Sequence, residues 1–299
     1  MNSSKLRTDL AIIIPVYNEQ NAITSTLKQI HNLFCKLDVR YEIIVINDGS
    51  NDNTGNILKA NVKKFKFTLL EHEKNKGYGA AIKTGVNFTE SKYIAITDAD
   101  GTYPNEQLPI LYSFIKDHDM VVGSRPFNSL PTKTKPVKWF INKLANYIVD
   151  YDIPDINSGL RIFKTSAFLP FLNIIPNGFS LTTTITLGMI SGGYIVKYIP
   201  IEYYKREGKS KIKPIRDTIN FVKLIMKMGL YFAPLKIFLP ISIIFFISSI
   251  IWGLVSLFIL GKLADTSTLL LMMFSLQVAV IALIAELINH RIPNFYHKK

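Results

Sequence analysis

The stretch LAIIIPV, residues 10–16, is an unbroken apolar run that ends just before the polar pair Asn18 and Glu19. Continuous apolar runs are typical of strands that are buried on both faces of a mostly parallel sheet. The intervening segments, such as 19–37 and 53–64, are long enough for crossover helices. The sequence therefore predicts an α/β domain with a mostly parallel sheet. The predicted strands are Leu10–Val16, Tyr41–Ile46, Phe67–Leu70, Tyr93–Thr97 and Met120–Val122.

Polar residues follow three of these predicted strands: Asn18–Glu19, Asp48–Ser50 and Asp98–Asp100. Ligands of open α/β sheets bind beyond the carboxyl ends of the strands, so we expect the three clusters to share one crevice. Asp98 and Asp100 are two carboxylates at positions i and i+2. Mg²⁺ and Mn²⁺ are often held by one or two carboxylates together with substrate phosphates. The sequence thus predicts a divalent metal site here, and a capped turn without metal is the alternative.

The 299-residue chain has a formal net charge of +13, which is compatible with nucleic acid, anionic lipid or a phosphorylated substrate as partner. Its basic residues adjoin a membrane-like segment, which argues against nucleic acid. Cys35 is the single cysteine, so no intrachain disulfide can form. The first 20 residues lack the long apolar core and cleavage site of a signal peptide. We therefore expect residues 1–212 to form a cytoplasmic enzyme domain.

Two uncharged stretches near the C-terminus, Ile237–Leu260 and Thr266–Ala285, are each long enough to cross a hydrocarbon core of about 30 Å. They predict a transmembrane helical hairpin over residues 236–289, and a buried core hairpin is the alternative. Lys and Arg flank the outer ends of the pair, whereas the linker carries only Lys262. The positive-inside rule then places both termini, including a basic tail at 290–299, in the cytoplasm. We also expect this multi-pass hairpin of the cell (inner) membrane to offer a surface for homo-oligomerisation.

Residues 213–235 mix basic and apolar side chains in a pattern that predicts an amphipathic helix on the inner leaflet. The segment Val137–Val149 has a similar pattern, with Trp139 as a candidate interfacial anchor. A helix packed on the globular core is the alternative for both segments, and for the second it is an equally good interpretation.

Seven motifs occur in the order typical of one enzyme family. They are AIIIPVYNE (11–19), VINDGSNDNT (45–54), NKGYGAAIKTG (75–85), TDADGTYP (97–104), VVGSR (121–125), DINSGLRIF (155–163) and YYKREGKSKI (203–212). Together they resemble the family-2 glycosyltransferases of GT-A fold, a Rossmann-like arrangement. The later motifs are most similar to polyprenyl-phosphate sugar transferases of the dolichol-phosphate mannose synthase type. The resemblance covers roughly residues 8–216 and does not indicate which sugar is transferred.

The resemblance implies a donor half that binds a UDP- or GDP-sugar. Gly77 and Gly79 would let the backbone approach the nucleotide, because glycine has no Cβ. Relatives often have glutamine at the position of Thr102, so a third side-chain metal ligand is not expected. The remaining implied donor-site residues are Pro15, Tyr17 and Glu19 around the nucleotide, Asp48 at the base or ribose, and Asp98 and Asp100 at the metal and diphosphate.

The resemblance also implies an acceptor half that binds undecaprenyl or dolichyl phosphate. Arg125, Arg161 and Arg206 would clamp the lipid phosphate, because guanidinium donors match phosphate oxygens. Lys209 and Lys211 would add charge near the membrane, and Asp155 would orient the acceptor or the sugar. These arginines, Asp100 and Asp155 are thus the expected catalytic residues.

The charge of the acceptor suggests a mechanism. A polyprenyl phosphate is anionic near pH 7, so its oxygen can attack the anomeric carbon without a strong general base, with inversion. The leaving diphosphate needs neutralisation by metal and arginine. Two other functions are compatible with part of the sequence. One is a membrane glycosyltransferase with a saccharide-hydroxyl acceptor, although its usual QxxRW motif is missing, and the other is a non-catalytic membrane scaffold.

Overall fold

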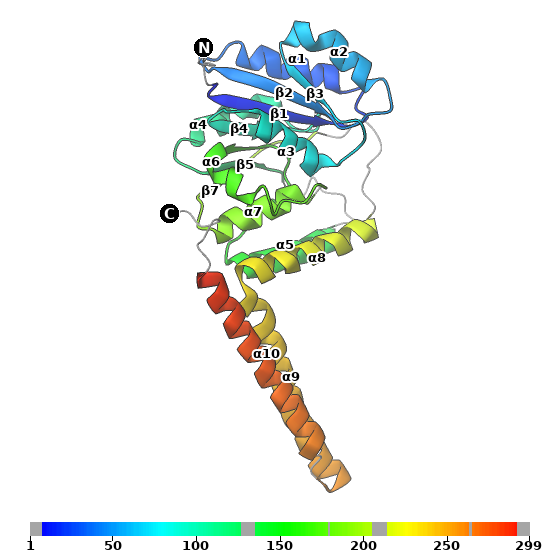
Figure 1. Cartoon of the computed structure of the whole chain (residues 1–299), viewed down its shortest axis with the longest axis vertical. Helices are drawn as coiled ribbons and strands as arrows, with labels where there is room; N and C mark the ends of the chain where they lie inside the picture. Colours follow the sequence, from blue (N-terminus) through cyan, green and yellow to red (C-terminus); the bar gives the residue numbers. More distant parts are fainter. Residues whose placement is uncertain (1–7, 127–134, 179, 205–213, 263–264, 292–299) are drawn as a thin grey trace.

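A seven-stranded sheet forms the core of the N-terminal domain, with strand order β3-β2-β1-β4-β6-β5-β7 (Figure 1). The computed structural model describes residues 8–126, 135–178, 180–204, 214–262 and 265–291. The strands are β1 (Leu10–Val16), β2 (Tyr41–Asn47), β3 (Thr68–Glu71), β4 (Tyr93–Ile96), β5 (Met120–Ser124), β6 (Arg161–Lys164) and β7 (Val196–Pro200). The five predicted strands are all present.

Helices cover both faces of this sheet, as the continuous apolar strands require. Alternate residues of β1 point to opposite faces, and all are buried: Leu10, Ile12 and Ile14 on one face, and Ala11 and Ile13 on the other. The first face packs on α1 (Ile23–Phe34), α2 (Thr54–Phe65) and α4 (Leu108–Phe114). The second face packs on α3 (Tyr78–Phe88), α6 (Thr165–Phe168) and α7 (Leu181–Ser191). The resulting α/β sandwich agrees with the predicted fold class.

Two strands that the sequence did not predict complete the sheet. β6 lies antiparallel between β4 and β5, and β7 is parallel to β5 at the edge. Arg161, the first residue of β6, pairs with both Ile96 and Val122. Because β6 runs in reverse, the segment before it lies beside the segments that follow β4 and β5. This one reversal brings residues 97–100, 125 and 155–160 to the same edge of the sheet.

Two helices, α5 (Lys135–Val149) and α8 (Pro214–Phe232), lie across the base of this domain (Figure 1). A third apolar cluster, which includes Ile141, Ile148 and Ile225, fixes them to α7. The opposite side of α5 exposes Trp139 and Phe140, which are 57% and 54% accessible. One face of α5 thus packs on the core, as one of the two interpretations of this segment predicts, whereas a position at the membrane interface stays a prediction.

The C-terminal hairpin consists of α9 (Pro234–Leu260) and α10 (Asp265–Arg291) and extends away from the sheet domain (Figure 1). Both helices are long and apolar enough to cross a membrane, and most of their apolar side chains are exposed. The helices are joined by serine hydroxyls. Ser242 and Ser275 each donate to the backbone carbonyl of the other, at 2.9 and 3.0 Å. The predicted pair of long apolar helices is therefore present.

A reciprocal contact attaches α5 to the start of α9. Pro240 lacks the N–H that would bond to the carbonyl of Lys236 within α9. The Tyr147 hydroxyl donates to this carbonyl at 3.0 Å. In return, the Lys236 ammonium donates to the carbonyls of Tyr147 and Ile148 at the end of α5 and also contacts Asp150. The hairpin is thus anchored to the sheet domain through α5.

Candidate active site

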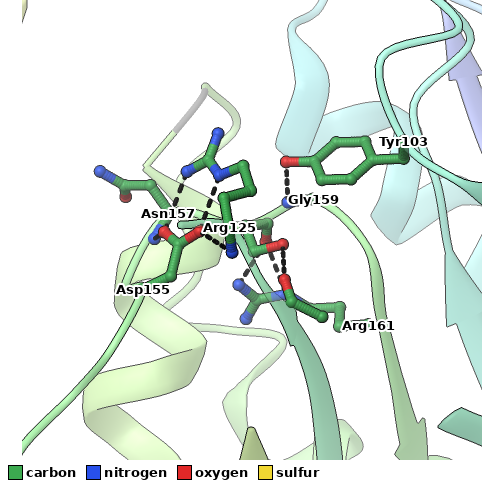
Figure 2. Close-up of polar contacts among 8 residues, drawn as sticks. Tyr103, Arg125, Asp155, Asn157, Gly159 and Arg161 are labelled. Carbon is green, nitrogen blue, oxygen red and sulfur yellow. Dashed lines mark hydrogen bonds and ion pairs between the residues drawn. The ribbon is translucent and has the colours of Figure 1, made fainter. Parts of the chain in front are cut away.

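Hydrogen-bonded residues from several sequence motifs gather where β4 and β5 end and β6 begins. We call six of these residues the strand-end cluster; Figure 2 shows four of them. The reversal of β6 brings the turn after β4 beside the 155–159 loop, so residues far apart in the sequence become neighbours. The cluster consists of Tyr78, Asp98, Tyr103, Arg125, Asp155 and Gly159.

Asp98 and Asp100 follow β4 and supply two carboxylates at this edge. The Asp98 carboxylate accepts a hydrogen bond from the Tyr78 hydroxyl at 3.0 Å. The Asp100 carboxylate accepts from the backbone N–H and the hydroxyl of Thr102, at 3.1 and 2.6 Å. Thr102 therefore supports Asp100 through both its backbone N–H and its hydroxyl.

The arrangement fits a divalent metal that takes most of its ligands from elsewhere. The Asp98 carboxylate lies against the backbone of Gly159, where an added Cβ would come within 2.8 Å of it. Among the described residues, no group of three or more His, Cys, Asp and Glu side chains could hold a metal. Two carboxylates with diphosphate and water ligands would instead suit Mg²⁺ or Mn²⁺.

Arg125 and Asp155 form a bidentate ion pair next to these carboxylates. Arg125 donates through Nε and Nη2 to the two Asp155 oxygens, at 2.7 and 2.9 Å (Figure 2). Its guanidinium also lies 5.2 Å from the ring centre of Tyr203. Burial acts to raise the pKa of Asp155, but the hydrogen bonds and charge of Arg125 outweigh it and lower the pKa. Asp155 is therefore ionised at neutral pH and poorly suited to act as a general base.

Arg161 is fully buried, which corrects its predicted position in a phosphate clamp. Its guanidinium donates to the carbonyl of Ser158 through Nε and Nη2, and to the Thr186 hydroxyl at 3.1 Å. A phosphate has no access to this group without rearrangement of the loop. A buried guanidinium must be hydrogen-bonded. Arg161 meets this need through the Ser158 carbonyl and thereby fixes the 155–159 loop.

Asp48 also has a different position from the one expected. Its side chain is buried, and its carboxylate accepts hydrogen bonds from the backbone N–H groups of Lys76 and Gly77, at 2.9 and 2.8 Å. The His72 ring contacts the same carboxylate at 2.7 Å and the Thr84 hydroxyl at 2.9 Å. This position corrects the prediction that Asp48 contacts the base or ribose. Asp48 instead holds the turn at 76–77 in place.

The glycines of this turn lie against protein backbone. A Cβ on Gly77 would come within 2.5 Å of the Asn177 carbonyl oxygen, and a Cβ on Gly79 within 2.1 Å of the Pro176 oxygen. Gly77 also has a φ of +100°, which side chains rarely allow. The segment before α7 thus explains both glycines, and their contact with a nucleotide stays a prediction.

The remaining predicted donor residues lie at the end of β1. Pro15 is buried within the strand opposite Ile46, and Tyr17 and Glu19 are half-buried just beyond it. The Glu19 N–H donates to the Thr54 hydroxyl at 3.0 Å, which ties this segment to the start of α2. Their part in nucleotide binding stays a prediction. The predicted acceptor residues Arg206, Lys209 and Lys211 lie outside the described residues.

Three residues of the strand-end cluster lie within the sequence motifs, but the sequence predicted no role for them: Tyr78, Tyr103 and Gly159. Tyr78 bonds to Asp98, and the Tyr103 hydroxyl accepts a hydrogen bond from the Gly159 N–H at 2.7 Å (Figure 2). The sequence signal was their position inside the GYG, GTY and NSG motifs. The pairing of Tyr103 with Gly159 depends on the β6 reversal, which no motif indicated.

Two family models match the chain. Residues 11–169 match the family described as glycosyl transferase family 2, and residues 233–290 match the GtrB C-terminal hairpin. The first match spans β1 to α6, and the second spans α9 and nearly all of α10.

Similar proteins include enzymes named for lipid phosphates. A dolichyl-phosphate hexose transferase of Haloferax volcanii is 29% identical over 226 residues, which cover 74% of this chain and 94% of that protein. An undecaprenyl-phosphate mannosyltransferase of Micrococcus luteus is 27% identical over 212 residues, which cover 67% of this chain and 86% of that protein. An uncharacterised protein of Methanocaldococcus jannaschii is 30% identical over 233 residues, covering 71% of this chain and 98% of that protein.

A solved structure with a similar fold is glucosyl-3-phosphoglycerate synthase of Mycobacterium tuberculosis, in complex with Mn²⁺, UDP and glucosyl-3-phosphoglycerate. Its TM-score is 0.56 at 14% sequence identity, and the match covers 75% of this chain and 79% of that one. At this identity the likeness shows the fold alone, a GT-A-like α/β sandwich.

Proposed function

Because the chain belongs to glycosyl transferase family 2, we propose that it transfers a sugar from a UDP- or GDP-sugar to a polyprenyl phosphate, with inversion, at the cytoplasmic face of a membrane. Family membership makes the protein a glycosyltransferase. The names of the Haloferax and Micrococcus relatives support undecaprenyl or dolichyl phosphate as the acceptor. The GtrB-type hairpin supports a site close to the bilayer.

The observation that best supports a lipid acceptor is the hydrogen-bonded contact between the Asp155 loop and α5. Asn142 of α5 donates to the Ile153 carbonyl at 2.8 Å, and the Ile153 N–H donates to the Asn146 side chain at 3.2 Å. Asp155 and its partner Arg125 therefore lie a few residues from a helix whose outer face exposes Trp139 and other aromatic side chains. Such a face suits the membrane interface. This arrangement would present a membrane-borne phosphate to the strand-end cluster.

The residues at the site would bind and orient the two substrates. Arg125 uses two of its five N–H donors on Asp155, so a lipid phosphate can engage the others. Asp155 would orient Arg125 and would not remove a proton, since the phosphate is already anionic. Asp98 and Asp100 would hold Mg²⁺ or Mn²⁺, which would neutralise the leaving diphosphate. The predicted phosphate contact of Arg206 remains part of this proposal.

The proposal can be tested with purified protein in nanodiscs. A panel of UDP- and GDP-sugars would be offered with undecaprenyl phosphate, with dolichyl phosphate, with a saccharide acceptor or with no acceptor, and nucleotide release and glycosylated product would be measured. We expect release that depends on a lipid phosphate and forms a lipid-phosphate sugar. Sugar transfer to a saccharide instead would support the alternative acceptor, and no transfer at all would support the scaffold interpretation.

We further propose that the sheet domain and both ends of the hairpin lie in the cytoplasm, as the distribution of basic residues predicts. A topology reporter fused at the C-terminus should report the cytoplasm, and one inserted after Lys262, between α9 and α10, should report the opposite side. Reporters on one side of the membrane at both positions would contradict a spanning hairpin.

A further inference from the structure

Tyr78 connects the turn at 76–77, which we call the glycine turn, to the carboxylate of Asp98. It is the first residue of α3, and its hydroxyl donates to Asp98 Oδ1 at 3.0 Å. The phenol hydroxyl therefore acts as a hydrogen-bond donor to the carboxylate.

The other side of the Asp98 carboxylate rests on Gly159. A Cβ at Gly159 would lie 2.8 and 2.9 Å from the two Asp98 oxygens, so any larger residue would displace the carboxylate. Gly159 is itself held by the hydrogen bond from its N–H to Tyr103. The carboxylate thus accepts a hydrogen bond from the Tyr78 hydroxyl and lies against a fixed backbone segment.

The backbone that carries Tyr78 is also fixed. Asp48 accepts hydrogen bonds from the two N–H groups that precede Tyr78, and the Ala80 N–H donates to the Asn177 carbonyl at 3.1 Å. The Tyr78 hydroxyl therefore comes from a rigid turn, and its bond to Asp98 has a defined direction. By contrast, the terminal torsion of an aspartate is intrinsically broad, so Asp98 needs an outside contact to define its orientation.

We infer that Tyr78 is a positioning residue that orients the Asp98 carboxylate toward the divalent metal and the donor diphosphate. This inference rests on the proposed donor site. Hydrogen-bond partners of metal ligands typically change metal affinity by about 10- to 100-fold when they are removed. Tyr78 also joins the glycine turn to the metal carboxylate, so the nucleotide-side and metal-side elements share one hydrogen-bonded unit.

The test is the Tyr78→Phe variant, which removes one hydroxyl and keeps the ring. Tyr198→Phe is the matched control, because the Tyr198 hydroxyl is buried without a hydrogen-bond partner among the described residues. Binding of Mn²⁺, alone and with UDP or GDP, would be measured by electron paramagnetic resonance and calorimetry. We expect Mn²⁺ to bind Tyr78→Phe about 10- to 100-fold more weakly, with excess Mn²⁺ restoring turnover and the KM for the lipid phosphate unchanged.

Gly159→Ala offers a second, independent variant, because it displaces the carboxylate while the Tyr78 hydroxyl stays in place. It should weaken Mn²⁺ binding as well. Wild-type Mn²⁺ affinity in Tyr78→Phe would overturn the inference, and the proposed metal site would stand if Asp98→Ala still lost binding. Wild-type Mn²⁺ affinity in Asp98→Ala would instead contradict the proposed metal site itself. A loss of thermal stability in Tyr78→Phe with unchanged Mn²⁺ affinity would show a structural role and would also overturn the inference.

Discussion

The strand-end cluster and the C-terminal hairpin place polar and apolar side chains in opposite ways. In the cluster, charged side chains such as Arg125 and Asp155 are largely buried, and specific partners hold them in place. In the hairpin, apolar side chains such as Phe258 and Ile259 are 81% and 74% exposed, and neutral serine hydroxyls make several of the polar contacts between the helices. A buried charge needs one defined geometry, whereas an apolar surface in lipid needs only its composition. Substitutions should therefore have large effects in the cluster and small effects in the hairpin.

The largest expected effect is on the Arg125–Asp155 pair. Asp155→Ala leaves the Arg125 guanidinium buried without its partner and should destabilise the sheet domain by about 3 kcal/mol. The double variant Arg125→Met with Asp155→Leu should recover most of this stability and have no turnover. Thermal and denaturant unfolding would be measured beside turnover, with Arg40→Met as a control at a solvent-exposed ion pair, where little loss of stability is expected. Retained turnover in the double variant would contradict a functional role for the pair.

The next effect concerns Asp98 and Asp100, the proposed metal ligands. Asp98→Ala and Asp100→Ala should each lower turnover at least about 10²-fold, the scale for loss of one electrostatic stabiliser. EDTA should abolish wild-type activity, and Mg²⁺ or Mn²⁺ should restore it. The control Asp9→Ala removes an exposed carboxylate far from the site and should keep turnover. Full activity of Asp98→Ala in EDTA would contradict the metal site.

A smaller effect is expected where the sheet domain meets the hairpin. Tyr147→Phe removes the hydroxyl that donates to the Lys236 carbonyl, which Pro240 leaves without a helical partner. The expected destabilisation is about 1 kcal/mol. It would be measured as the thermal stability of the protein in detergent, with the exposed Tyr151→Phe as the control. Equal stability of the two variants would show that the contact contributes little.

The smallest effect is expected within the hairpin, at Gln277. This amide is exposed near the middle of α10, in a span that begins at Thr266 and ends at Asn289. A second copy in the same orientation places its own Gln277 at the same depth, where two amides can pair. If the predicted homo-oligomer uses this surface, Gln277→Leu should weaken association by about 0.6 kcal/mol, roughly threefold. Cross-linking in nanodiscs would measure it, with Met273→Leu as the control and unchanged turnover expected in both variants.

The same contrast separates what could be predicted from what could not. The hairpin followed from two uncharged stretches, and the five predicted strands followed from apolar runs, because both signals are local in the sequence. The antiparallel β6 was missed: RIFK is only four residues long and has a charged residue at each end of its two apolar residues. The arginine at its start then resembled a surface phosphate ligand, although pairing with Ile96 and Val122 buries it in the sheet.

The sequence by itself determined the fold class, the glycosyltransferase family resemblance, the DxD carboxylates and the two long apolar helices. These depend on composition, short periodicity and ordered motifs. Only the tertiary structure decided that Arg161 is buried, that Asp48 holds the glycine turn and that Tyr78 contacts Asp98. Each of these depends on contacts between residues 20 or more positions apart, with partners chosen by sheet order and burial. A motif can show which residues a site contains, but their partners are selected only when the chain packs.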